Sequence, residues 1–157
     1  MLIILFFGLL YPRLLQNTGE EETPLSEEEQ QLVNEARAVV ERFNGIYIAQ
    51  SEEEFSRIIE DTWLDAEDVQ ESMREIFHNA QESGYVDLEI SFADESIVRA
   101  DNEDAFMYKA TMFIKITKED GMYDEYNLEA EYYFKKANDG SYKLEEIKTI
   151  DNSTMPK

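Results

Sequence analysis

The sequence predicts an α+β domain in which three N-terminal helices pack on a curved antiparallel sheet of four to five strands. Before Gly84 the apolar residues recur at three- and four-residue spacing, which is the period of a helix. After Gly84 they alternate with polar residues, which is the period of a half-buried strand. Glycine-containing turns separate the alternating stretches and predict hairpins. Long antiparallel strands with one apolar face need a cover, and the amphipathic helices supply it.

Each predicted helix combines a start signal with one apolar stripe. Ser26 with Glu29, and Ser51 with Glu54, have the spacing of a capping box, and Asp65 is placed to cap the third helix. The expected inward residues are Leu32, Ala36, Val39, Val40 and Phe43, then Phe55, Ile58 and Ile59, then Val69, Met73, Ile76, Phe77 and Ala80.

The alternation also predicts which strand residues face the helices. A first strand with Val86 inward is expected to end near Phe92, and a short second strand covers 96–99. The spacing from Leu144 to Ile147 predicts a bulge near Glu145. The other inward residues are Leu88 and Ile90; Phe106, Tyr108, Ala110, Met112, Ile114 and Ile116; Tyr126, Leu128, Ala130, Tyr132 and Phe134; and Tyr142 and Ile150.

Composition excludes several classes of function. The 157 residues include 36 acidic and 14 basic side chains, which gives a net charge of −22. Because such a surface repels phosphate groups, nucleic-acid binding is excluded, whereas a basic partner or cations would be attracted. There is no cysteine, so disulfides, thiol nucleophiles, cysteine-based metal sites and a lipoprotein anchor are excluded as well.

The N-terminal segment, residues 1–16, is interpreted as an anchor or signal-like segment. Residues 2–11 are apolar without interruption, but a membrane-spanning helix needs roughly twenty such residues. A signal peptide would have basic residues before this run and a small-residue cleavage site after it, and neither is present. We expect an uncleaved membrane anchor at residues 2–15 whose basic end lies upstream, and an extracytoplasmic domain. The alternative is a cytoplasmic protein whose residues 1–16 pack on the domain.

Three further segments complete the expected organisation. Residues 17–25 are acidic, with a glycine and a proline, and are interpreted as a linker. Residues 26–151 form the folded domain, and residues 152–157 are a C-terminal tail.

The element order and the closing segment DGSYKLEEIKTI resemble the nuclear transport factor 2-like superfamily, a cone-shaped α+β fold shared with ketosteroid isomerase and scytalone dehydratase. In the closing segment, Gly140 is followed by Tyr142, Leu144 and Ile147. The resemblance covers residues 26–151, and it implies a domain type that also occurs behind single membrane anchors in bacteria. A cystatin-like arrangement is the alternative, but it would place one helix on the sheet where three are predicted here.

The resemblance also implies a hollow between sheet and helices, where enzymes of this superfamily use a carboxylate base and a tyrosine or histidine donor. The candidate pocket residues are Tyr47, Trp63, Tyr108, Asp124 and Tyr126. Buried tyrosines are more often core residues with a hydroxyl at the edge, and the carboxylate at the sheet rim is expected to be solvated. No catalytic residue, cofactor or metal ligand is therefore assigned.

Two other motifs are interpreted as non-catalytic. His78 is the only histidine and is expected to be a partly exposed helix residue. The segment 101–104 is acidic, but a calcium loop that starts at Asp101 needs glycine at its sixth position and glutamate at its twelfth. These positions are Phe106 and Met112, so the segment is interpreted as a charged turn.

The expected function is a non-catalytic, extracytoplasmic binding or assembly module tethered to a bacterial membrane. The alternative is a small-molecule enzyme of the ketosteroid isomerase or dehydratase type. The expected partners are a protein or a small apolar ligand. A homodimer through the outer face of the sheet would require one copy's glutamates to meet the other copy's lysines, and these residues are Glu125, Glu129, Glu131, Lys109, Lys115 and Lys135.

Overall fold

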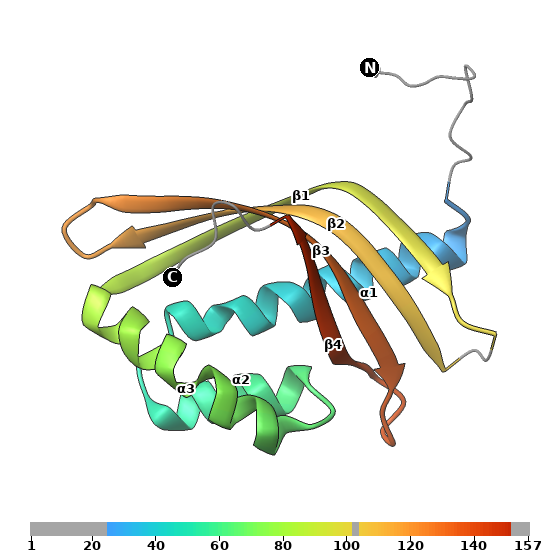
Figure 1. Ribbon diagram of the computed structural model, residues 1–157, viewed down its shortest axis with the longest axis horizontal. Helices are drawn as coiled ribbons and strands as arrows, with labels where there is room; N and C mark the ends of the chain where they lie inside the picture. The colour runs from blue at the N-terminus through green and yellow to red at the C-terminus, as the bar shows by residue number, and fades with distance from the viewer. Residues whose placement is uncertain (1–24, 102–103, 152–157) are drawn as a thin grey trace. The chain divides into compact units, whose positions relative to one another are not determined.

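The computed structural model describes residues 25–101 and 104–151, and it confirms the predicted α+β fold (Figure 1). The chain divides into two compact units, 1–30 and 31–157, and the contacts below lie in the second unit apart from the start of the first helix. The helical elements are α1 (Glu27–Asn44), the short 3-10 helix η2 (Gly45–Tyr47), α2 (Glu52–Thr62) and α3 (Ala66–Ser83).

Four antiparallel strands follow and form one sheet in the order β1-β2-β3-β4. Their bounds are Tyr85–Arg99, Ala105–Lys118, Tyr123–Lys136 and Tyr142–Asp151. The helices lie on one side of this sheet in Figure 1. The predicted anchor at residues 1–16, the predicted tail at 152–157 and residues 17–24 of the predicted linker 17–25 lie outside the described residues.

The predicted helix starts are formed by side-chain caps in α1 and α2. The Ser26 hydroxyl accepts the Glu29 N–H at 3.1 Å, and the Glu29 carboxylate accepts the Ser26 N–H at 3.0 Å. At α2, the Ser51 hydroxyl accepts the Glu54 N–H at 3.1 Å. Asp65 stands at the N-cap of α3 but makes no side-chain capping bond, so that part of the prediction is wrong.

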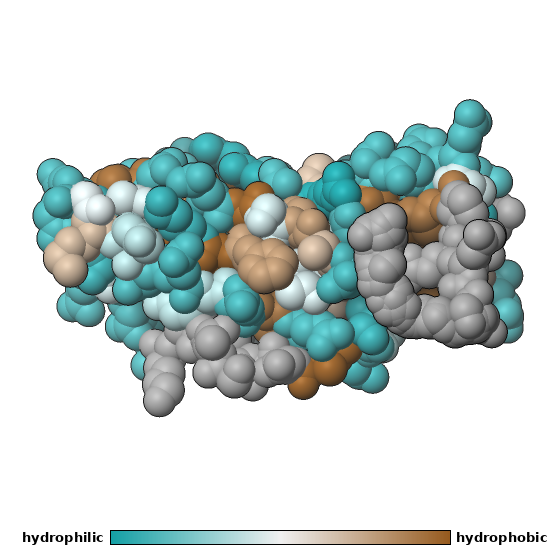
Figure 2. Space-filling view, turned by 90° about the horizontal axis from the view of Figure 1, so that it is seen from above, coloured by the Kyte–Doolittle hydropathy of each residue, from teal (hydrophilic) through white to brown (hydrophobic). Residues whose placement is uncertain are grey.

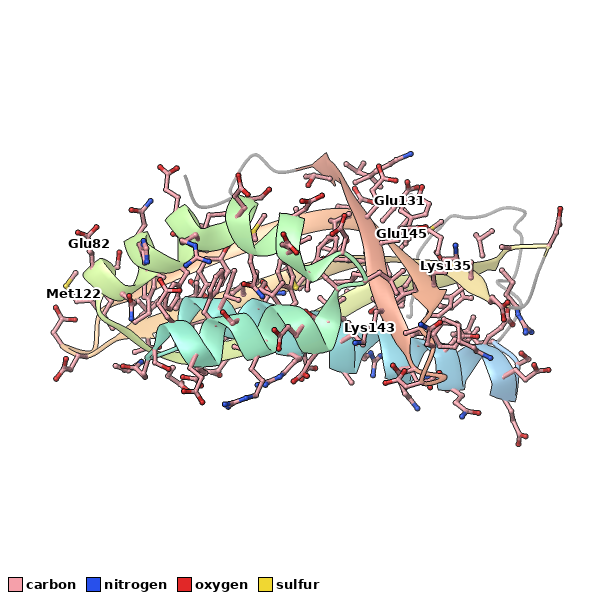
Figure 3. All side chains as sticks on the ribbon, turned by 90° about the horizontal axis from the view of Figure 1, so that it is seen from below. Glu82, Met122, Glu131, Lys135, Lys143 and Glu145 are labelled. Carbon is pink, nitrogen blue, oxygen red and sulfur yellow. The ribbon has the colours of Figure 1, made fainter. Side chains whose placement is uncertain are left out.

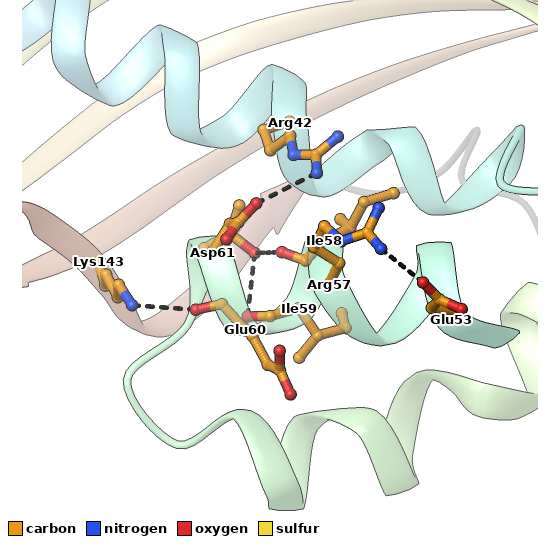
Figure 4. A network of polar contacts seen from close by, with 9 residues as sticks. Arg42, Glu53, Arg57, Ile58, Ile59, Glu60, Asp61 and Lys143 are labelled. Atoms are coloured by element: carbon orange, nitrogen blue, oxygen red, sulfur yellow. Dashed lines mark hydrogen bonds and ion pairs between the residues drawn. The ribbon is translucent and has the colours of Figure 1, made fainter.

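The end of α2 is held to its neighbours by the polar contacts drawn in Figure 4. Asp61 pairs with Arg42 of α1 at 3.1 Å, and the Lys143 ammonium of β4 donates to the Glu60 carbonyl at 3.0 Å. The Thr62 hydroxyl donates to the Ile58 carbonyl at 2.7 Å. Of these donors, the Lys143 ammonium satisfies a carbonyl group of the last turn that has no partner within the helix.

The core is built from the predicted inward faces of β2 and β3 and from the helix stripes. Tyr108, Tyr132 and Phe134 of the sheet are at most 1 % exposed. Phe55 and Phe77 are fully buried and stack with ring centroids 4.6 Å apart, which joins α2 to α3. Burial of aromatic side chains of this size supplies much of the hydrophobic stabilisation of a domain.

Strand β1 differs from the prediction because it contains two bulges. It is a single strand that includes residues 96–99, which were expected to be separate. A first register shift lies between Tyr85 and Asp87, and Val86 is 50 % exposed where it was predicted to be inward. A second shift follows Ala93, where Asp94 adopts a left-handed backbone with φ 55°. An extra residue in one strand exchanges the faces of the side chains around it.

Strand β4 also has two register shifts, and one of them was predicted. Glu145 has no partner between the pairs that Leu144 and Glu146 make with β3, which confirms the predicted bulge. The second shift leaves Ile150 without a partner, and its side chain is 48 % exposed where it was predicted to be inward. In α3, Ile76 is 37 % exposed because Phe77, its neighbour, occupies the buried line of the helix.

The turn after β2 contacts the end of α3. The Glu119 N–H donates to the Gly84 carbonyl at 3.0 Å, and Figure 3 shows Glu82 and Met122 at the same end of the molecule. At the other end, Lys135 and Lys143 are direct cross-strand partners. This like-charge pair is tolerated because Lys143 bonds to α2.

We expect Ser51→Ala to destabilise the domain by about 1 kcal/mol, because the first turn of α2 would lose its cap. Asp65→Ala is the matched control: it removes a residue at the same helix position that makes no capping bond, so its loss should be clearly smaller. Urea unfolding of both variants measures the difference. Equal losses would show that the capping bond of Ser51 contributes nothing.

Candidate functional site

The structure distributes the five predicted pocket residues over three places on the inner side of the sheet. Tyr108 joins a carboxylate and an arginine that the sequence analysis did not include. Asp124, Tyr126 and Tyr47 form a second group, and Trp63 packs elsewhere. The predicted residues therefore do not make one pocket.

The first group is a hydrogen-bonded cluster of Arg37, Glu95 and Tyr108, from α1, β1 and β2. The Arg37 Nε donates to Glu95 Oε2 at 2.5 Å, and a terminal guanidinium nitrogen donates to Oε1. The Tyr108 hydroxyl donates to Glu95 Oε2 at 2.6 Å. Tyr108 is fully buried, and the Glu95 side chain is 15 % exposed. The bulge at Asp94 allows Glu95 to reach this position from an edge strand.

The electrostatics of this cluster keep its protons in place. The hydrogen bond from Arg37 lowers the pKa of Glu95, with Tyr108 adding to the effect against the opposing influence of burial. Burial, followed by the bond to Glu95, raises the pKa of Tyr108. At neutral pH the carboxylate is therefore charged and the phenol protonated. A carboxylate that accepts a bidentate arginine and a phenol is a positioned structural group and a poor general base.

The second group lies near the start of β1 and contains a carboxylate and three tyrosines. The Tyr85 hydroxyl donates to Asp124 Oδ2 at 2.5 Å. Burial raises the pKa of Tyr85, and the bond to Asp124 and the nearby Tyr126 add to that rise. Burial and then Tyr126 also raise the pKa of Tyr47. The sequence analysis missed Tyr85 because the bulge after it reverses the alternation that begins at Val86.

Trp63 is the C-cap residue of α2. Its ring makes an edge contact with Phe43 at 5.5 Å, and its backbone forms a parallel bridge with Leu144. The indole Nε1 is buried and has no hydrogen-bond partner within the described part of the chain. Its contacts connect α1, α2 and β4, so its role is in packing.

The remaining polar clusters are on the surface. His78 is exposed, as predicted, and its Nε2 lies 2.9 Å from Glu52, which also pairs with Arg74 at 2.8 Å. The hydrogen bond from His78 is the largest cause of a lowered pKa at Glu52. Between residues 25 and 151, leaving out 102 and 103, no group of three acidic or histidine side chains is placed to hold a metal ion.

The outer face of the sheet carries a shallow depression of about 270 Å³, lined by residues 89–91, 113–115 and 125–127. Phe113 lies in it with 41 % of its surface exposed. Lys115 has Glu89 and Glu125 as cross-strand partners. Figure 2 views the molecule from this side and shows apolar atoms exposed among hydrophilic ones.

Charges on the outer face alternate in sign within one chain. Lys109 is the cross-strand partner of Glu131, and its ammonium lies 3.9 Å from the Glu129 carboxylate. Of the lysines that were expected to meet glutamates of a second copy, Lys109 and Lys115 thus already have glutamate neighbours in one copy, whereas Lys135 lies opposite Lys143. Opposite-charge neighbours of this kind are mildly favourable at a sheet surface.

Comparison with known proteins identifies fold relatives only. No family model and no curated protein matches the sequence. An IcmL-like type IV secretion system protein from Legionella pneumophila superposes with a TM-score of 0.63 at 10% identity, covering 86% of this chain and 99% of that chain. The intermembrane space region of the chloroplast protein ARC6 gives a TM-score of 0.51 at 11% identity, with 82% and 100% covered.

A third structure, a protein from Catenulispora acidiphila in complex with S-DNPA, superposes with a TM-score of 0.55 at 12% identity, covering 77% of this chain and 93% of that chain. At identities this low the likeness concerns the fold, which is an α+β, cone-like arrangement of three helices and a curved sheet. Among the described residues no helix has the length and apolarity to cross a bilayer, and residues 2–15 are not among them.

We expect Glu95→Gln to destabilise the domain by about 2 kcal/mol at pH 7, since hydrogen bonds to the charged carboxylate would be lost. Arg37 is 39 % exposed and regains water, which keeps the loss below that of a fully buried pair. Because the pKa of Glu95 is lowered in the folded state, its stabilisation is complete above the ordinary glutamate pKa. It is lost as the pH falls through the lowered value.

Unfolding of the wild type and Glu95→Gln in urea at a series of pH values between 7 and 3 tests this. The difference between the two should shrink only at the acidic end of the series. Tyr108→Phe, which removes one donor and keeps the ion pair, should cost less at pH 7. A pH-independent difference would mean that the charge of Glu95 has no part in stability.

Proposed function

We propose that this protein is a non-catalytic binding or assembly module of nuclear transport factor 2-like fold, held at a bacterial membrane by residues 2–15 and facing away from the cytoplasm. The observation that carries the proposal is the state of Glu95, which is bonded to Arg37 and Tyr108 in the chain itself. A base for proton transfer needs a lone pair directed at a substrate, and this carboxylate directs its oxygens at the protein.

The outer face of the sheet is the contact surface in this proposal. It combines a half-exposed aromatic side chain, Phe113, with a shallow depression, and aromatic anchors are enriched at protein interfaces. The alternating charges of Lys109, Lys115 and their glutamate neighbours spare this face the strong repulsion expected from a chain with a net charge of −22. A second copy of the chain can therefore dock there face to face.

The membrane attachment is supported by the apolar residues 2–11 and by analogy with the fold. One fold relative is described as a type IV secretion system protein, and another as an intermembrane space region. Both descriptions belong to those proteins. They make a non-cytoplasmic assembly role a reasonable hypothesis for this chain.

Cysteine cross-linking of the full chain in bacterial cells tests the proposal, and the absence of native cysteine makes the readout specific. Ser91 is the cross-strand partner of Phe113 on the outer face. We expect Ser91→Cys to give a disulfide-linked dimer in the membrane fraction, because the same residue of two copies would meet near the symmetry axis. Ser72→Cys, at an exposed position of α3, is the matched control and should stay monomeric.

The same experiment has two contradicting results. Recovery of the full chain in the cytosolic fraction would overturn the membrane attachment. Equal cross-linking of Ser91→Cys and Ser72→Cys would mean random collision and would overturn the outer-face dimer.

The alternative function, a small-molecule enzyme of the ketosteroid isomerase or dehydratase type, is favoured by one observation. Asp124 lies with Tyr85, Tyr126 and Tyr47 on the inner side of the sheet, and a carboxylate beside phenols is the arrangement that such chemistry uses. An enzyme of this type would exchange the α-hydrogen of a cyclic ketone for deuterium, as followed by NMR, and Asp124→Asn would abolish the exchange. A binding module would leave the ketone unchanged with either residue.

A further inference from the structure

Strand β1 is an edge strand with a long regular section. In the sheet order its single neighbour is β2, and its residues 87–93 pair in continuous register with residues 111–117. The two bulges lie on either side of this section. A regular stretch of this length spans roughly 23 Å and presents a row of peptide groups to any extended chain beside it.

The other edge of the sheet is covered at Leu144. At β4, the Leu64 N–H donates to the Leu144 carbonyl at 3.0 Å, and Trp63 forms a parallel bridge with the same residue. The regular section of β1 has no such segment beside it in the described part of the chain. The two edges therefore differ in their capacity to accept a further strand.

The inward side chains of this section are incompletely buried. Leu88, Ile90 and Phe92 face the helices but remain half-buried. Their direct partners on β2 are at most 4 % exposed, and these are Ile116, Ile114 and Met112. Because burial of apolar area is favourable in proportion to the area removed from water, apolar side chains of an added strand would gain free energy by packing against this row.

The outward side chains of this section favour a neighbouring strand that carries positive charge. Asp87 and Glu89 are exposed and face away from the helices, and β1 has no basic residue before Arg99. Lys115 lies opposite Glu89, whereas Asp87 lies opposite a threonine. A neighbouring strand would therefore be stabilised by lysine or arginine at its outward positions.

A second copy of β1 does not meet this requirement. Antiparallel pairing of two such sections would place the carboxylates of Asp87 and Glu89 from both copies on one face without a basic side chain between them. Like charges across a strand pair are destabilising, and acidic side chains on an edge oppose self-association. The matching occupant is a basic strand from another protein.

We propose that the free edge of β1 between Asp87 and Ala93 accepts an extended segment of a partner protein as a fifth strand, in which apolar residues alternate with lysine or arginine. The main-chain bonds supply affinity, and the alternating side chains supply selectivity. This proposal deepens the proposed binding function and rests on it. It uses the backbone edge of β1, whose residues 89–91 also line one side of the outer-face depression.

The test uses the full chain in zwitterionic detergent and a synthetic seven-residue peptide of alternating lysine and valine. Hydrogen exchange measured by mass spectrometry should slow in the fragment that contains residues 87–93, and the protection should weaken with added salt. A peptide of alternating glutamate and valine is the matched control and should give no protection.

A variant of β1 reverses the expected selectivity. Asp87→Lys combined with Ser91→Lys makes the outward row basic and leaves the Glu89–Lys115 pair in place. The glutamate peptide should now protect residues 87–93, and the lysine peptide should lose at least tenfold in affinity. Because one variant gains a ligand as it loses another, a folding defect cannot imitate the result.

Four outcomes would overturn the proposal, and only the last of them is also a failure of the proposed function. Absence of protection by the lysine peptide, or unchanged selectivity in the variant, removes the edge site. Protection that extends to residues 125–127 on β3 removes the edge site while leaving a binding module that uses the outer face. Ketone exchange that depends on Asp124 would remove the binding function itself.

Discussion

The contacts that β1 makes on the inner side of the sheet depend on two single-residue bulges. A regular strand presents every second side chain to the core, so an extra residue exchanges the faces on either side of it. The bulge after Tyr85 puts its phenol next to Asp124, and the bulge at Asp94 puts Glu95 between Arg37 and Tyr108. Without these shifts Tyr85 and Glu95 would face water, and Asp124 and Tyr108 would lose them as hydrogen-bond partners.

The same geometry constrains the chemistry of the inner face. A buried phenol needs an acceptor. One bulge brings the Tyr85 phenol to Asp124, and the other brings the Glu95 carboxylate to Tyr108. Each pair satisfies two polar groups at once, which stabilises the fold and uses the lone pairs that a proton-transfer reaction would require. The cluster at Glu95 is further committed by its arginine, whereas Asp124 has a phenol alone among its described side-chain hydrogen bonds. Asp124 is therefore the carboxylate that would act as the base in the enzymatic alternative.

The sequence was sufficient to predict the fold, the faces of β2 and β3 and one bulge in β4, because propensity, caps and alternation agree there. It did not predict the faces of β1. An odd spacing between two inward apolar residues indicates an extra residue in the strand. Phe92 and Ile97 have such a spacing, as Leu144 and Ile147 do, but the polar residues between Phe92 and Ile97 were interpreted as a break between two strands. The candidate pocket lacked two residues for the same reason. Tyr108 and Asp124 face inward as expected, while their partners Glu95 and Tyr85 reach the inner face through the bulges of β1.

The distribution of charge relates the two proposed surfaces to each other. All lysines in the described residues lie on β2, β3 and β4, whereas β1 has four carboxylates and a single arginine. In these proposals, an acidic edge beside a face of alternating charge would let two copies approach through the face and would disfavour pairing edge to edge. Open-ended sheet growth between identical chains is thereby disfavoured, and the edge stays available to a chain of opposite charge. The net acidity of the protein is in this view the feature that separates self-association from recognition of a basic strand.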